Sequence, residues 1–97
     1  MARQRINVEN VNHPGKQTQV DARLYEAMRK AYLEVVPDAA PGITLAEIGA
    51  RVAPHLPEDL FPGSARAGWW AKTVQLDLEA KGLIRRTRTS PIRLHKV

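Results

Sequence analysis

The sequence contains no cysteine, and its other potential metal ligands are sparse. Without thiols the chain has no disulfide framework and no thiolate metal site. Histidine occurs only at His13, His55 and His95, which are too far apart for the close pairs that place two ligands on one element. We therefore expect no metal centre and no cofactor.

A long apolar run is missing as well. No stretch approaches the roughly 18 apolar residues of a membrane-spanning helix, and the first ten residues lack the apolar core of a secretory signal. The expected protein is cytoplasmic and has no membrane partner.

Catalytic constellations are also absent from the pattern. Glu58 and Asp59 are adjacent in a proline-rich connection, so they do not form an opposed acid–base pair. Ser64 and Ser90 have no nucleophile motif around them. We expect no enzymatic activity.

Positive charge is abundant and unevenly placed. The 97 residues suit one domain and carry a net charge of +5. Residues 64–97 contain eight basic and two acidic side chains, whereas residues 21–63 contain four basic and seven acidic ones. A basic region of this kind indicates contact with nucleic acid, although many small basic proteins bind no specific anion.

Two helices are predicted before the basic region. Residues 20–36 have apolar side chains at helical spacing, with Leu33 on the polar side and therefore expected at the surface. Ile43 is expected in a strand of one or two residues. Thr44 and Glu47 have the spacing of a capping box for a helix over residues 45–52. The connection that follows is long, and its apolar side chains, Leu56, Leu60 and Phe61, are expected in the core.

The helix predicted over residues 67–81 is the centre of the chain. Ser64 is its expected N-cap, and Gly82 is expected in the left-handed conformation that ends helices. Trp69 and Trp70 are both expected in the core. A polar strip is expected at Gly68, Lys72, Gln75 and Glu79. Asp77 falls between two apolar faces, so we expect it to have a partner such as Arg85 or Arg86.

After Gly82 the pattern alternates with period two on both sides of a turn at residues 89–91, which predicts a hairpin over residues 83–97. The predicted fold is mainly α with a small β-hairpin (α+β), a winged helix-turn-helix with three helices plus a C-terminal wing. Residues 20–97 form its single domain, and residues 1–19 are an N-terminal arm and turn. Arg3 and Arg5 give this arm two further basic groups.

Three stretches of the sequence resemble a small uncharacterised bacterial family of single-domain proteins. They are PGK at 14–16, PGIT at 41–44 and LPEDLFPGSARAGWWAKTVQLDLEAKG at 56–82. The resemblance covers most of the chain, and the GWWAKTVQLDLEAKG segment is its most specific part. It implies a winged-helix-like domain and brings no activity, ligand or catalytic residue.

Duplex DNA is the first predicted partner, since the last helix of a winged helix can enter the major groove while the wing touches the backbone. The predicted contacts are Gly68, Lys72 and Gln75 on the helix and Arg85, Arg86, Arg88, Arg93 and Lys96 on the hairpin. The alternative is a protein-interaction module, or a homodimer, on the same scaffold, with an exposed Trp or Leu33 as anchor. A solvated helix face with no binding role also fits the strip around Lys72.

Overall fold

The computed structural model describes residues 4–97 and folds them into three α-helices and two small antiparallel sheets. In chain order the elements are β1 (Arg5–Glu9), β2 (Gln17–Asp21), α1 (Ala22–Val35), β3 (Ile43–Thr44), α2 (Leu45–Val52), α3 (Ala67–Ala80), β4 (Ile84–Thr87) and β5 (Arg93–Lys96). Short 3-10 turns at Ala53–His55 and Pro62–Ser64 lie between α2 and α3. The predicted mixed α+β class is confirmed.

The first sheet is a hairpin that the sequence did not predict. β1 pairs with β2 where an arm and a turn were expected, and Val8 and Val20 of this hairpin are buried. Val20 had been assigned to the first helix, but that helix begins at Ala22. Its N-cap is Asp21, whose side chain accepts hydrogen bonds from the backbone N–H groups of the first turn. Residues 1–3 of the predicted arm lie outside the described residues.

The second sheet has the strand order β3-β5-β4. Ile43 pairs with Leu94, so the expected very short strand at Ile43 is present and joins the C-terminal hairpin. Gly42, just before it, has a φ of +84°, and a Cβ atom there would lie 2.0 Å from the carbonyl oxygen of Leu94. Glycine is therefore required for both the backbone conformation and the close approach.

The α2 cap agrees with the sequence in detail. Thr44 accepts a hydrogen bond from the backbone N–H of Glu47, and the Glu47 carboxylate accepts one from the backbone N–H of Thr44. The bonds that Glu47 accepts from Thr44 hold the pKa of this carboxyl below its usual value. The predicted capping box is confirmed, and it fixes the start of α2 directly after β3.

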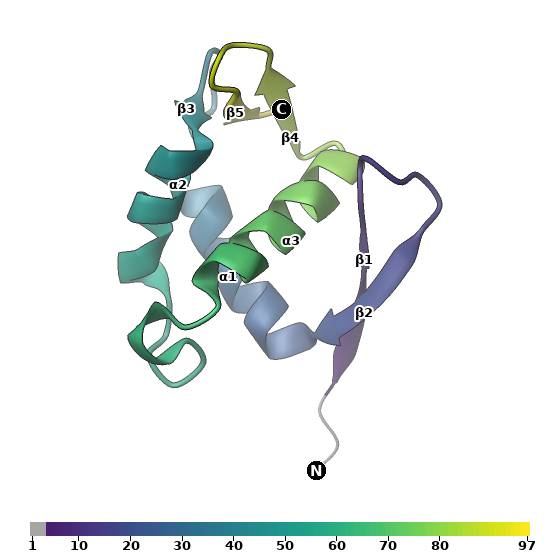
Figure 1. The fold of residues 1–97 in the computed structure, drawn as a ribbon, viewed down its shortest axis with the longest axis vertical. Coiled ribbons are helices and arrows are strands. Elements are labelled where there is room, and N and C mark those ends of the chain that lie inside the picture. Colours follow the sequence, from purple (N-terminus) through teal and green to yellow (C-terminus); the bar gives the residue numbers. More distant parts are fainter. Residues whose placement is uncertain (1–3) are drawn as a thin grey trace.

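The core lies between α1 and α3 and is closed by α2 and by both sheets (Figure 1). Tyr25, Met28 and Tyr32 contribute from α1, and Phe61 enters from the connection after α2, as predicted. Leu56 and Leu60 pack against this core. Leu33 packs there too and is half-buried, so the prediction of an exposed Leu33 is wrong.

Both ends of α3 depart from a simple helix. At its C-terminal end Gly82 has a φ of +75°, and the N–H groups of Gly82 and Leu83 donate to the carbonyls of Glu79 and Leu78. This is the predicted glycine termination. At its N-terminal end the cap is Arg66, two residues after the predicted Ser64, whose side chain lies outside the described part of the structure.

Candidate nucleic-acid interface

Most of the second half of α3 is enclosed by other elements. Five consecutive residues, Val74 to Leu78, are buried, which a helix with a solvent-facing strip does not show. The enclosure comes from α1 on one side, from β1 of the N-terminal hairpin on another, and from β4 at the C-terminal end. Val74 to Leu78 therefore offer little surface to a partner.

Asp77 is fully buried within this enclosed half. One carboxylate oxygen accepts a 2.9 Å hydrogen bond from the backbone N–H of Glu9, and the other lies 2.8 Å from the Nζ of Lys81 and accepts a short hydrogen bond from the hydroxyl of Tyr25. The expectation of a partner was right, but Arg85 and Arg86 are not the partners. Burial and the hydrogen bond to Asp77 raise the pKa of the Tyr25 hydroxyl.

The predicted polar strip of α3 is largely covered. Gln75 is 4% exposed and its side-chain amide donates to Glu79 at 3.2 Å, so Gln75 is not available as a DNA contact. Glu79 is half-buried and receives two hydrogen bonds from the guanidinium of Arg86. The bond to Glu79 raises the pKa of Arg86 and keeps it charged, but its charge is neutralised within the molecule.

Two further predicted contacts in the wing also have partners inside the protein. Arg93 donates to the carbonyl oxygen of Gly42 at 3.4 Å and lies 3.9 Å from the Glu47 carboxylate. Lys96 lies 3.5 Å from Asp38. Arg93 and Lys96 of the C-terminal hairpin thus have acidic neighbours within the protein, as Arg86 does.

The remaining predicted contacts are exposed. Gly68 and Lys72 lie on the first half of α3, and Arg85 and Arg88 lie in and just after β4. Within residues 4–97 these three cations form no salt bridge, unlike Arg86, Arg93 and Lys96. The basic charge that faces solvent on the predicted interface comes from Lys72, Arg85 and Arg88.

Trp69 is the main residue that sequence reasoning misplaced. Trp70 is buried as expected, but Trp69 is 57% exposed and is the most exposed aromatic side chain in the described chain. The two rings pack edge to face, with centroids 5.0 Å apart and planes at 82° to each other. Trp70 thus supports Trp69 from the core side and leaves the outer part of the Trp69 indole uncovered.

Arg66, directly before α3, is a second residue that the sequence did not single out. Its φ is +59°, and within residues 4–97 it is the only residue other than glycine in the left-handed region. An arginine pays a steric cost of about 1 kcal/mol for this conformation, which a glycine would not. No sequence pattern signals the strain, because a cap position normally carries Ser, Thr, Asn or Asp.

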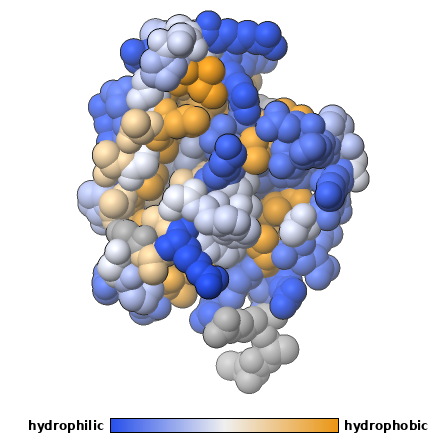
Figure 2. All heavy atoms as spheres, in the orientation of Figure 1, coloured by the Kyte–Doolittle hydropathy of each residue, from blue (hydrophilic) through white to orange (hydrophobic). Residues whose placement is uncertain are grey.

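Two neighbouring cavities lie between α3 and the β1–β2 hairpin, and Val20 and Trp69 line both of them; we call these cavities the two ends of the Trp69 groove. Its wider end, about 530 Å³, is lined by Arg5, Gln19, Val20, Asp21, Arg66, Trp69 and Trp70. Its narrower end, about 220 Å³, reaches Lys16 and His13 in the hairpin turn. In the space-filling view, hydrophobic atoms are visible between α3 and the hairpin, within a mostly hydrophilic surface (Figure 2).

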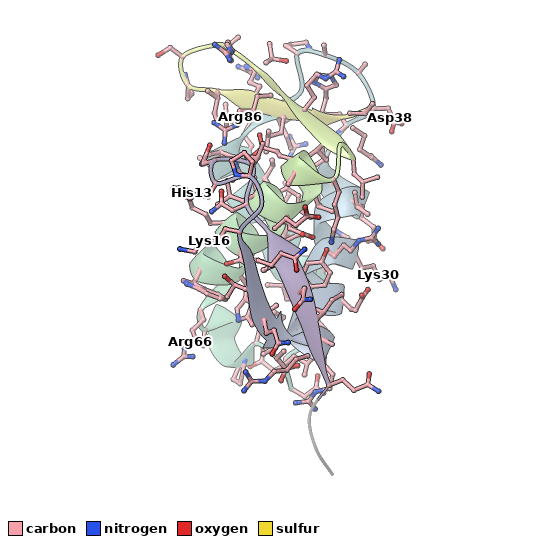
Figure 3. The ribbon with its side chains drawn as sticks, turned by 90° about the vertical axis from the view of Figure 1, so that its right-hand side faces the viewer. His13, Lys16, Lys30, Asp38, Arg66 and Arg86 are labelled. Atoms are coloured by element: carbon pink, nitrogen blue, oxygen red, sulfur yellow. The ribbon has the colours of Figure 1, made fainter. Side chains whose placement is uncertain are left out.

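The basic groups of these elements share one side of the molecule. In the side view, Arg66, Lys16, His13 and Arg86 all lie toward the side on which α3 is found, whereas Lys30 and Asp38 lie on the opposite side (Figure 3). A second hollow of about 460 Å³ lies beside β4 and brings Arg85, Arg86 and Arg88 next to the hairpin turn at Val11 and Asn12. The α3 side is therefore hollowed in two places and basic at both.

Residues 4–97 contain no group of three or more His, Asp or Glu side chains placed to hold a metal ion. Helices able to cross a membrane are likewise not found in this part of the chain, where none is long and apolar enough.

Comparison with known proteins gives one finding. No curated protein and no solved structure matches the chain significantly. A family model matches residues 5–94, nearly the whole length, and it describes a family of unknown function. The matched range includes the β1–β2 hairpin, so this hairpin is part of the unit that the family shares. The chain belongs to this family of unknown function, DUF6958.

Proposed function

We propose that this protein is a winged-helix protein that binds duplex DNA through the first half of α3 and through the wing formed by β4 and β5. The order α1-β3-α2-α3-β4-β5 and the pairing β3-β5-β4 support the winged-helix assignment, since they follow the order of helices and strands in that fold.

The observation that carries the proposal is the distribution of unpaired charge. Lys72 on α3 and Arg85 and Arg88 on the wing are exposed and have no acidic partner within residues 4–97, whereas the other wing cations are neutralised internally. Unpaired cations on a helix and an adjacent hairpin are the groups that neutralise DNA phosphates. Gly68 leaves space for close approach of the DNA backbone beside Lys72.

The enclosed second half of α3 limits how this helix docks. Base contacts in helix-turn-helix proteins come mainly from the N-terminal part of the recognition helix. That is the part of α3 that is exposed here, while Gln75 to Leu78 are buried. The proposed DNA contacts are accordingly Gly68 and Lys72 on the helix, with Arg85 and Arg88 on the wing.

The test is fluorescence anisotropy of a labelled blunt duplex, titrated with protein at several salt concentrations. We expect log K to fall linearly with log salt, by about 0.9 for each phosphate neutralised. Lys72→Ala and Arg85→Ala should each weaken binding and lower the salt slope by about 1. Lys30→Ala is the matched control, because Lys30 is equally exposed but lies on the opposite side.

Equal effects of Lys72→Ala and Lys30→Ala would mean that binding follows net charge alone, and would overturn the proposed interface. The same conclusion follows if the wild-type protein does not bind the duplex at low salt. A protein-interaction module is the second candidate function, because Trp69 is an exposed large apolar side chain of a type favoured in interfaces.

A further inference from the structure

The side chains that line the Trp69 groove are not among the proposed duplex contacts. It combines one exposed indole with two guanidiniums, those of Arg5 and Arg66, and with the side-chain amide of Gln19. The wide end has a volume of about 530 Å³, within the range of roughly 300–1,000 Å³ that small-molecule sites occupy. Few other surfaces of a small protein bring an aromatic face and two positive charges into one hollow.

The indole of Trp69 is held rigidly but is left open. Edge-to-face packing on buried Trp70 fixes the ring, and 57% of the residue remains exposed. A fixed and open aromatic face is what a nucleobase stacks upon in proteins that bind single strands, and such stacking tolerates any base because every base has a π-face. Bases in an intact duplex are already stacked on one another and do not present a face to Trp69.

Arg66 provides an independent observation. It is a left-handed residue directly before α3, and it is one of the residues that line the wide end of the groove. Backbone strain of this kind is typical of functional positions, where the surrounding structure holds a residue in an unfavourable conformation. A glycine would remove the strain but would also remove the guanidinium from the groove.

The charges of the groove favour an anion. Arg5 and Arg66 line its wide end, and Lys16 lies at its narrow end. Two carboxylates also line it, Asp21 at the wide end and Glu9 at the narrow end. Asp21 stays ionised while it caps α1 through the N–H groups of Arg23 and Leu24, so the three cations of the groove outnumber its two carboxylates by one.

We propose that the Trp69 groove binds single-stranded nucleic acid, with one unpaired base stacked on Trp69 and its phosphates beside Arg66 and Arg5. The inference rests on the proposed function in one respect, since the single strand is taken to continue from a duplex held by Lys72 and the wing. The resulting substrate class is a duplex with an unpaired end or gap.

The test compares three labelled DNAs by anisotropy: a blunt duplex, the same duplex with a single-stranded thymidylate extension of about eight nucleotides, and the extension alone. We expect the extended duplex to bind about tenfold or more tightly than the blunt one. Intrinsic fluorescence gives a second readout, because stacking on Trp69 quenches its emission while buried Trp70 supplies the unchanged background.

Variants of Trp69 separate stacking from folding. Trp69→Leu should abolish the preference for the extended duplex and the quenching, yet bind the blunt duplex within about threefold of wild type, since no charge is lost. Trp69→Phe, which keeps an aromatic face, should retain most of the preference. Circular dichroism should show both variants folded, because the side chain is mainly exposed.

Each remaining outcome decides one of the two claims. Equal affinity for blunt and extended duplexes would overturn the single-strand inference and leave the proposed duplex binding intact. Binding of the free single strand without any binding of duplex would support the groove and overturn the proposed function. If neither is bound, or if Trp69→Leu keeps the full preference, the groove is not a nucleic-acid site, and its exposed Trp69 then points to a protein partner.

Discussion

The two halves of α3 belong to one helix but differ sharply in burial. In the second half, five residues in a row are buried and a carboxylate without exposure, Asp77, has three partners. In the first half, an indole is more than half exposed and Lys72 has no acidic partner among residues 4–97. The difference shows that one half of the helix holds the fold together and the other is left open for contact.

The buried half should be the more sensitive to substitution. Asp77→Ala leaves the hydroxyl of Tyr25 and the N–H of Glu9 without their buried acceptor, and we expect it to destabilise the protein by about 3–5 kcal/mol. Urea unfolding followed by circular dichroism measures this loss. Asp38→Ala is the control, because the Asp38 side chain is 91% exposed and should change stability by less than about 0.5 kcal/mol. A loss below 1 kcal/mol for Asp77→Ala would show that the enclosure of α3 is not tight.

High pH should lower the stability of the protein through the two buried tyrosines of α1. Burial raises the pKa of Tyr25 and of Tyr32, so both stay neutral in the folded protein when the unfolded chain begins to ionise near pH 10. The two neutral tyrosines make their full contribution to the free energy of unfolding below pH 10. That contribution is lost as the pH rises further, by up to about 1.4 kcal/mol per pH unit for each tyrosine. Stability measured between pH 8 and pH 11 should fall less steeply in Tyr25→Phe. An identical slope in both proteins would count against a buried Tyr25.

The junction before the exposed half should gain stability from glycine. Arg66→Gly relieves the left-handed strain, and we expect stability to rise by about 1 kcal/mol while binding of the extended duplex weakens. Arg85→Gly removes the same charge from a strand and should lower stability by about 0.5–1 kcal/mol. Thermal unfolding of the two variants makes the comparison, and a destabilised Arg66→Gly would show that the arginine side chain supports the fold.

The exposed half itself should tolerate change. Lys72→Ala removes no side-chain hydrogen bond or ion pair within residues 4–97 and places a good helix former on the surface, so stability should stay within about 0.5 kcal/mol of wild type. Differential scanning calorimetry of the variant tests this expectation. A loss of several degrees in Tm would mean that Lys72 belongs to the fold, and its effect on DNA binding could not then be assigned to contact.

Sequence reasoning worked where a local pattern has one structural meaning. The Thr44–Glu47 capping box and the glycine termination at Gly82 depend on neighbouring residues only, and both are present as predicted. The alternation around the turn at residues 89–91 likewise predicted the two strands of the C-terminal hairpin, β4 and β5. Local hydrogen bonds decide these features, so the sequence is sufficient to identify them.

It failed where distant parts of the chain compete for the same residue. Val20 suits a helix face and a strand equally well, and only the pairing of Val20 with Ile6 decides for the hairpin. Gln75 looked exposed because the helix pattern alone did not show that its polar face would be covered. Trp69 was expected in the core because the helical spacing puts it on a largely apolar face, whereas in the structure its ring packs on Trp70 and stays 57% exposed.

The hydrogen bond from Glu9 to Asp77 joins residues 68 positions apart, and it has a consequence for the order of assembly. An isolated two-stranded hairpin is marginally stable in water. The hairpin of β1 and β2 therefore becomes stably folded only when α3 packs against it. During synthesis the first strands leave the ribosome long before that helix does. The N-terminal residues therefore stay unfolded until α3 has been synthesised. Any truncation that removes α3 should also unfold the β1–β2 hairpin.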